Sequence, residues 1–241
     1  MPASPDAWDA FVEEADPGSY LQLAAWANVK ASNGWSASRF IADTPSGPMG
    51  AQVLLRRPRV LPWAVAYAPR GPVTAAGWDP ASIPAFTEAT RDAMRTAGRV
   101  SHLRIDPEIE ADGPFDPDGA LRRALRASGW RPAPAVQPAS TRMIDLRPDE
   151  ATLLGDLRKK WRQYVNRART AGVTVEDADA DSLSIFYAIY RETATRAGFV
   201  IRTEQTYRGI WEAFRPQGRA RLLIARLPDG EPAAALFLIR C

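Results

Sequence analysis

The 241-residue sequence predicts a mixed α/β fold with two domains, residues 1–147 and 148–241. Three observations lead to this prediction. Strand-like and helix-like stretches alternate along the chain, which is typical of mixed α/β proteins. The order of elements restarts after residue 147, and a chain of this length can form two cores. The composition, 46% hydrophobic and 24% charged, is that of a globular protein.

The first half is predicted to begin with two short amphipathic helices. One spans residues 5–15, and the other starts after a cap at Ser19 and ends at Asn33-Gly34. The strand-like runs SASRFIAD and GAQVLLRRPRVLP follow, and DTPSGPM between them predicts an antiparallel hairpin. The remaining elements are, in order, the strand WAVAYAPRGPV, a helix over residues 80–98, the strand VSHLRIDPEI, a helix ending at Gly129 and the strand STRMIDL.

The second half is predicted to start with one long helix, PDEATLLGDLRKKWRQYVNRARTAG, before the strand VTVED. Apolar residues at three-four spacing give this helix a core-facing stripe. The stripe consists of Leu153, Leu154, Leu157, Trp161, Tyr164, Val165 and Ala168. Two helices, DSLSIFYAIYRETATRAG and TEQTYRGIWEAFR, precede a hairpin of RARLLIARL and EPAAALFLIRC across PDG. The last strand is apolar enough to be central, which predicts that the chain is a fragment and its second domain incomplete.

Composition and charge exclude several classes of protein. The net charge is +3 and the pI about 9.2. A single cysteine, Cys241, excludes an internal disulfide framework and is compatible with a reducing cytoplasm. One histidine with one cysteine argues against a zinc site, and we expect neither a metal nor a cofactor. The acidic N-terminus is no signal peptide, and no apolar run reaches the length of a membrane span. We therefore expect a cytoplasmic protein.

The segment RKKWRQYVNRAR, residues 158–169, carries six cationic side chains and no acid. Such a run is often a solvated helix face whose long side chains cover apolar neighbours. Here no acid is available for i,i+4 pairs, and the like charges repel one another. A bound anion such as a phosphate would relieve that repulsion. We expect the aromatic side of this helix to face the core and the cationic side to face an anionic ligand.

Six segments, taken in their order along the chain, carry a resemblance to a known protein family. They are SYLQLAAWANVKASNGW, AYAPRGPV, LRIDPEI, STRMIDL, LRKKWRQYVNRARTAGVTVE and FYAIYRETATRAGFVIRTEQTY. Their order and spacing resemble the FemABX family, aminoacyl-tRNA-dependent peptidyltransferases that attach amino acids to peptidoglycan precursors. The resemblance covers almost the whole chain, from about residue 8 onward. With no long heptad stretch, the chain resembles the compact members that lack a coiled-coil arm.

The resemblance implies a fold, substrates and partners. It implies two domains of the acetyltransferase (GNAT-like) fold, the second of them incomplete here, with the acceptor bound in a cleft between them. The acceptor would be a muropeptide precursor, UDP-MurNAc-pentapeptide or lipid II, and the donor an aminoacyl-tRNA. A lipid-linked acceptor would bring the protein into peripheral contact with the inner membrane face. Both substrates are anionic, which suits a basic cleft.

Four substrate-binding positions carry over from the family. Lys30 and Arg162 match basic positions that contact the phosphates of the acceptor. Asp106 matches an acidic position lining the acceptor cleft, and Tyr207 an aromatic position near the substrate. Structural interpretations stay open beside these: a surface lysine at a helix end, a turn-former before a proline, and simple packing for the tyrosine. Arg70 is interpreted as a structural loop residue.

The implied chemistry needs little from side chains. An aminoacyl ester is already activated, so the protein has only to position the substrates, accept a proton and stabilise an oxyanion. A family lysine that contributes to transfer has no counterpart in these residues, so we expect this chain by itself not to catalyse transfer; no catalytic residue is assigned. One alternative is a coenzyme A-dependent N-acyltransferase, although the segment R/Q-x-x-G-x-G/A is absent. Another is a non-enzymatic RNA-binding protein, although the aromatics are not spaced for stacking.

Overall fold

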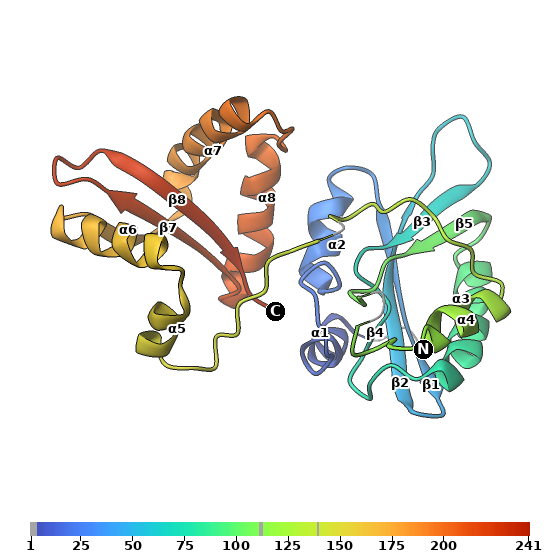
Figure 1. Cartoon of the computed structure of the whole chain (residues 1–241). Coiled ribbons are helices and arrows are strands. Elements are labelled where there is room, and N and C mark those ends of the chain that lie inside the picture. Colours follow the sequence, from blue (N-terminus) through green and yellow to red (C-terminus); the bar gives the residue numbers. More distant parts are fainter. Residues whose placement is uncertain (1–3, 111–112, 139) are drawn as a thin grey trace. The chain divides into compact units, whose positions relative to one another are not determined.

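The computed structural model of the protein describes residues 4–110, 113–138 and 140–241. It contains two compact units: residues 1–139 together with Cys241, and residues 140–240. Each unit has a β-sheet packed against helices, which confirms the predicted mixed α/β class (Figure 1). The second unit begins at Ser140, the first residue of the segment STRMIDL. The domain boundary between residues 147 and 148 stays a prediction.

The first unit is built on a sheet with five strands among the described residues. They are β1 (Ser36–Thr44), β2 (Gly47–Arg56), β3 (Ala64–Ala68), β4 (Val73–Thr74) and β5 (Val100–Ile105). The strand order is β1-β2-β3-β5, and β4 pairs with β2. All pairs are antiparallel except β3 with β5, which run parallel. The β1–β2 hairpin predicted from the sequence is therefore confirmed.

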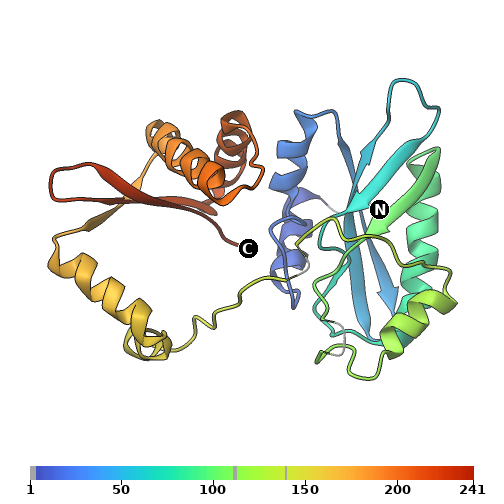
Figure 2. The ribbon, with the colours of Figure 1, turned by 45° about the horizontal axis from the view of Figure 1, so that its top comes forward.

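Helices cover both faces of this sheet (Figures 1 and 2). They are α1 (Pro5–Glu13), α2 (Ala24–Ala31), the 3₁₀ turn η1 (Pro80–Ser82), α3 (Ile83–Thr96) and α4 (Ala120–Ala127). Successive residues of a strand point to opposite faces. Met49, Ala51 and Val53 of β2 accordingly pack toward Phe86 of α3 in one hydrophobic cluster. On the other face, the backbone of Gly50 lies against the rings of α1. β2 is thus the buried centre of the first unit.

Two predictions for the first 150 residues are wrong. Ser19 does not cap the second helix, because α2 begins only at Ala24, whose N–H donates to Oδ1 of the buried Asp9 at 2.7 Å. Residues 19–22 form a turn instead, closed by the N–H of Gln22 and the carbonyl of Ser19 (2.8 Å). The segment STRMIDL, residues 140–146, is not a strand, because no strand of either described sheet pairs with it. Its apolar side chains are consequently exposed.

The second unit combines a three-stranded antiparallel sheet with helices, counted over the described residues. Its elements are α5 (Glu150–Asp156), α6 (Lys159–Thr170), β6 (Thr174–Ala178), η2 (Ala180–Ser182), α7 (Leu183–Ala197), α8 (Glu204–Phe214), η3 (Arg215–Gln217), β7 (Ala220–Arg226) and β8 (Pro232–Ile239). The strand order is β6-β7-β8, and the predicted β7–β8 hairpin is confirmed. Phe237 of β8 packs on Phe186 of α7 and Trp211 of α8, so this face of the sheet forms the core.

Two predictions for this unit are corrected. The expected long helix is two helices, because Leu157 adopts an extended conformation (ψ 142°) between α5 and α6. Trp161 and Tyr164 are not in the core: 59% and 48% of their surfaces are exposed, and no residue of α6 is buried. Three-four spacing fixes only which residues share a face, not whether another element covers that face. Among the described residues, strand β8 pairs with β7 alone and leaves Leu236 51% exposed. The prediction that β8 is a central strand of a longer protein stays a prediction.

Candidate functional site

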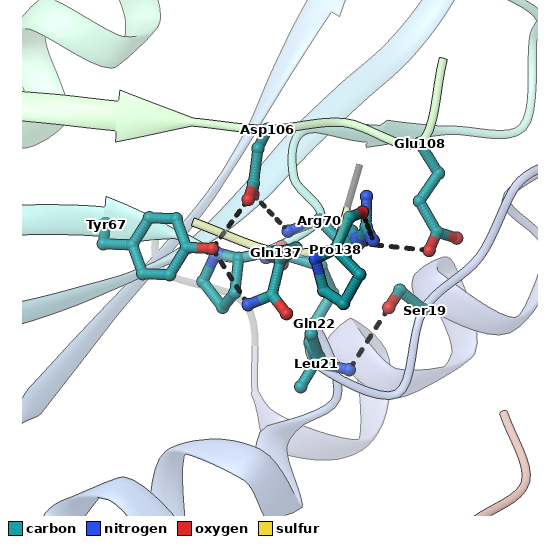
Figure 3. A network of polar contacts seen from close by, with 10 residues as sticks. Ser19, Leu21, Gln22, Tyr67, Arg70, Asp106, Glu108, Gln137 and Pro138 are labelled. Atoms are coloured by element: carbon teal, nitrogen blue, oxygen red, sulfur yellow. Dashed lines mark hydrogen bonds and ion pairs between the residues drawn. The ribbon is translucent and has the colours of Figure 1, made fainter. Parts of the chain in front are cut away.

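The parallel strands β3 and β5 of the first unit end side by side, and polar side chains gather there (Figure 3). Asp106 directly follows β5. Its Oδ2 accepts a 2.7 Å hydrogen bond from Oη of Tyr67 on β3, and its Oδ1 accepts one of 2.7 Å from the N–H of Arg70. The carboxyl ends of parallel strands are where open α/β sheets commonly bind ligands. We take this network as the centre of the candidate site.

The network also holds the segment that leaves the first unit. Nε2 of Gln137 donates to Oη of Tyr67 at 3.0 Å, and a guanidinium N–H of Arg70 donates to the carbonyl of Pro138 at 3.1 Å. Arg70 also forms a 3.2 Å ion pair with Glu108. Its φ of 53° lies in the left-handed region, which a side chain other than glycine rarely adopts. These contacts agree with the structural role predicted for Arg70 in the loop.

The phenol of Tyr67 acts as a hydrogen-bond donor. Burial raises its pKa well above the ordinary value, and the hydrogen bond to the Asp106 carboxylate raises it further. Both effects keep the hydroxyl protonated at neutral pH. Tyr67 can therefore orient a carboxylate or donate to an oxygen, but it cannot serve there as a general base.

Two fully buried glutamines support the loop between β3 and β4, which spans residues 69–72. Nε2 of Gln22 donates to the carbonyl of Pro69 at 2.7 Å, while its Oε1 accepts from the N–H of Gln52 at 2.7 Å. The amide of Gln52 in turn donates to the carbonyl of Leu23 at 2.9 Å. Buried amides are tolerated when they are satisfied in this way. Sequence reasoning missed both residues, although a polar Gln52 inside the apolar run GAQVLL was a usable signal.

A cavity of about 600 Å³ lies beside the network. Asp106 lines it, together with Leu103, Leu125, Trp130 and the segment 131–136. Four arginines also contribute to its wall: Arg104, Arg122, Arg126 and Arg131. The cavity is therefore lined by apolar side chains and by these four arginines, which we call its cationic rim.

Only one of these four arginines has an ion-pair partner among the residues that the structure describes. Nε of Arg122 lies 2.8 Å from Oδ2 of the buried Asp116. Arg104, Arg126 and Arg131 have no described carboxylate within ion-pair distance. Guanidinium groups bind phosphates and carboxylates well, so the rim can accept an anionic group.

The other three predicted site residues have structural partners. Lys30 lies in the last turn of α2, with Nζ 5.2 Å from the ring centre of Trp26. The guanidinium of Arg162 on α6 donates to the carbonyls of Gly155 and Leu157, where α5 ends. Tyr207 on α8 packs against Phe186, with ring centres 5.2 Å apart.

The predicted residues fall in different units. Lys30 and Asp106 belong to the first unit, and Arg162 and Tyr207 to the second. Within the second unit, no contact recorded for the described residues joins Arg162 to Tyr207. The substrate-binding roles of all four residues stay predictions. In the described parts of the chain, no three His, Cys, Asp or Glu side chains are grouped to hold a metal ion, and no helix is both long and apolar enough to cross a bilayer.

Comparison with known proteins identifies the family. Residues 4–118 and 126–232 match the sequence model of the FemAB family. The chain belongs to the FemAB family. This confirms the FemABX resemblance seen in the sequence.

Named relatives of this FemAB-family chain include two glycyltransferases. The Lipid II:glycine glycyltransferase of Staphylococcus saprophyticus is 28% identical over 247 residues, which cover 100% of this chain and 58% of that protein. The Staphylococcus aureus protein of the same name is 28% identical over 235 residues, with 94% and 54% covered. The crystal structure of FemX matches with a TM-score of 0.77 and 26% identity over 94% of this chain and 57% of that one. The chain thus spans a little over half the length of these relatives. The structural match to FemX confirms the predicted fold class.

Proposed function

We propose that this FemAB-family chain is part of an aminoacyltransferase that builds the interpeptide bridges of peptidoglycan. In this proposal an amino acid moves from aminoacyl-tRNA to the stem peptide of a peptidoglycan precursor, either UDP-MurNAc-pentapeptide or lipid II. The observation that carries the proposal is the match of 94–100% of the chain to proteins named Lipid II:glycine glycyltransferase. Aminoacyl-tRNA is a cytoplasmic substrate, so we place the reaction on the cytoplasmic side.

The arginine-rimmed cavity of the first unit supports an anionic acceptor. A muropeptide precursor carries a pyrophosphate and free carboxylates, and each is a good ligand for a guanidinium fork. Arg104, Arg126 and Arg131 stand on the rim without a described ion-pair partner, so binding an anion there breaks no existing pair. The Tyr67–Asp106 network fixes the loop at the edge of the same cavity. Lys30 and Arg162 remain our candidates for the pyrophosphate, and Tyr207 for packing near the substrate.

The proposed reaction is an acyl transfer. The amine of the stem peptide attacks the carbonyl carbon of the aminoacyl ester, a C–N bond forms, and the bond between that carbon and the ribose oxygen of the tRNA breaks. One proton leaves the amine, and one is taken up by the departing ribose hydroxyl. Positioning of the two substrates supplies much of the rate, since the ester needs no enzyme nucleophile. A neutral donor such as Tyr67 orients polar groups but takes no proton.

The test measures transfer directly. The gene product containing these 241 residues is incubated with UDP-MurNAc-pentapeptide or lipid II as acceptor, and with a mixture of charged tRNAs or acetyl-CoA as donor. The tRNA reactions are run with and without RNase. The mass of the precursor is then measured. A gain of one amino-acid residue that RNase abolishes supports the proposal and identifies the donor amino acid. No gain with either the UDP-linked or the lipid-linked acceptor contradicts it, and a gain from acetyl-CoA instead favours the coenzyme A-dependent alternative.

A further inference from the structure

The loop between β2 and β3 exposes apolar side chains at its tip. Its sequence is RPRVLPW, residues 57–63, and it projects from the end of the first unit's sheet (Figures 1 and 2). Val60 is 88% exposed, Leu61 38% and Trp63 43%. A single exposed apolar residue needs no explanation. Three of them within four positions at a projecting tip indicate an interaction site for an apolar partner or a membrane.

The three chain segments at the same end of the sheet are cationic. Three chain segments meet there, residues 33–36, 56–64 and 97–100, as the pairs Ser36–Leu55 and Ala64–Val100 show. They contribute Arg56, Arg57, Arg59 and Arg99, and they contain neither Asp nor Glu. Arg56 lies over the ring of Trp35 at 5.9 Å. In the described part of the chain, the other three arginines have no carboxylate within ion-pair distance.

We propose that this β2–β3 loop docks the first unit on an anionic membrane surface. Aliphatic side chains gain free energy by leaving water for the acyl region, and tryptophan favours the headgroup level. Arginines beside them bind the phosphates of acidic lipids. Single-stranded RNA is the other polyanion that arginine and tryptophan can hold. The most exposed of the three apolar side chains, however, is Val60, which offers no ring for stacking and gains only by burial, and this favours lipid.

Backbone contacts and two prolines constrain the loop, which lowers the ordering cost of docking. β2 and β3 pair at Leu54–Tyr67, Leu55–Ala66 and Arg56–Val65 directly below it. Within the loop, the N–H of Leu61 donates to the carbonyl of Pro58 at 3.1 Å. Prolines fix the backbone on both sides of the tip, at positions 58 and 62.

The loop also lies away from the candidate site. It enters β3 at Ala64, whereas Tyr67 and the Asp106 network lie at the other end of that strand. The separation along the strand is roughly 10 Å from Ala64 to Tyr67, at about 3.3 Å per residue. The membrane can therefore hold the tip while the network stays open to substrate. The inference stands on the loop alone, although a lipid-linked acceptor in the proposed reaction would give the docking a use.

Vesicle binding tests the proposal. The 241-residue chain is sedimented with vesicles of phosphatidylcholine alone or mixed with phosphatidylglycerol, with no muropeptide present. Binding is expected only to the acidic vesicles. Arg57→Gln/Arg59→Gln should weaken it about 25-fold, at roughly fivefold for each arginine. Val60→Ser, at an almost fully exposed side chain, should weaken it about fivefold without affecting the fold.

Matched controls separate the loop from net charge. Arg191→Gln/Arg196→Gln on α7 removes the same two charges from exposed positions and should bind acidic vesicles like the original chain. Equal loss in this control, no loss in the loop variants, or no binding by the original chain would overturn the proposal. So would loop variants that lose RNA binding but keep vesicle binding, which would assign the loop to RNA. Transfer to the UDP-linked acceptor, measured without membranes, tests the proposed function separately.

Discussion

Oη of Tyr67 donates a 2.7 Å hydrogen bond to Oδ2 of Asp106, which lies 39 positions further along the chain. The bond joins the ends of two parallel strands, and the same carboxylate accepts a hydrogen bond from the N–H of Arg70 in the loop between β3 and β4. Through Gln137 and Pro138 the same network holds the end of the first unit. Asp106, which the family resemblance predicts to line the acceptor cleft, therefore has a structural role that experiments must separate from the predicted one.

Tyr67→Phe should lower the free energy of unfolding of the first unit by about 1–3 kcal/mol. The change removes the hydroxyl to which Oδ2 of Asp106 and the amide of Gln137 are both hydrogen-bonded. Both groups are partly buried and would lose this bond. Urea unfolding followed by circular dichroism measures the loss. Tyr164→Phe is the matched control, since that side chain is 48% exposed on α6, and it should change stability by less than about 0.5 kcal/mol. A Tyr67→Phe variant as stable as the original would mean that the network does not hold the loop.

Two substitutions of Arg162 can show whether its role is structural or in phosphate binding. Arg162→Ala removes the guanidinium that donates to the carbonyls of Gly155 and Leu157, so it should destabilise the second unit by about 1–2 kcal/mol. It should also weaken binding of UDP-MurNAc-pentapeptide if the residue contacts phosphates. Arg162→Lys keeps the charge but loses the fork that reaches two oxygens. Calorimetric binding that is equal in all three proteins would exclude the phosphate role, whatever the change in stability.

Asp116 should make the first unit sensitive to acid. Burial alone would raise its pKa, but hydrogen bonds from the Leu121 amide (2.9 Å) and from Arg122 (2.8 Å) outweigh burial and hold the pKa below its usual range. The unfolded chain then binds the proton more readily, so the carboxylate contributes stability above about pH 3.9 and loses it as the pH falls through the lower, folded pKa. Asp116→Asn should be less stable than the original chain at pH 7. The gap in urea midpoint should close as the pH drops below about 3.9, and a gap that is constant with pH would contradict this.

Gly71→Ala should destabilise the first unit by about 1–3 kcal/mol. A Cβ at this position would lie 2.8 Å from Nε2 of Gln22, whose amide is buried and held by Pro69 and Gln52. The amide cannot move aside without losing those bonds. Gly209→Ala in α8 is the control, because nothing lies within 4 Å of its Cβ and alanine favours a helix by about 0.5–1 kcal/mol. Thermal unfolding should shift in opposite directions for the two variants.

Sequence patterns predicted where helices and strands form better than they predicted which faces of those elements are buried. The β1–β2 and β7–β8 hairpins were predictable because strand runs and turn residues are local signals. The exposure of Trp161 was not, since spacing cannot tell whether a partner covers a helix face. The helix break at Leu157 was missed because the three-four apolar spacing continues through it, although Gly155 and Asp156, both poor helix formers, were a usable signal.

The candidate site was predictable only in part. The family resemblance pointed to Asp106, but its partner Tyr67 follows from the parallel pairing of β3 with β5, which no local pattern specifies. Lys30, Arg162 and Tyr207 came from the same resemblance, and their roles toward a substrate await the binding experiments. The cationic rim joins Arg104 of β5 to Arg131 beyond α4, residues that only the fold brings to one cavity.

The exchange of hydrogen bonds between Gln22 and Gln52 has a consequence for synthesis on the ribosome. When only the two N-terminal helices have emerged, the Gln22 amide has neither the backbone of residue 52 nor the carbonyl of Pro69 to bind. Burying it at that stage would leave it unsatisfied, at a cost of about 1–3 kcal/mol. We therefore expect the N-terminal helices to dock fully only after β2, β3 and Pro69 have left the exit tunnel.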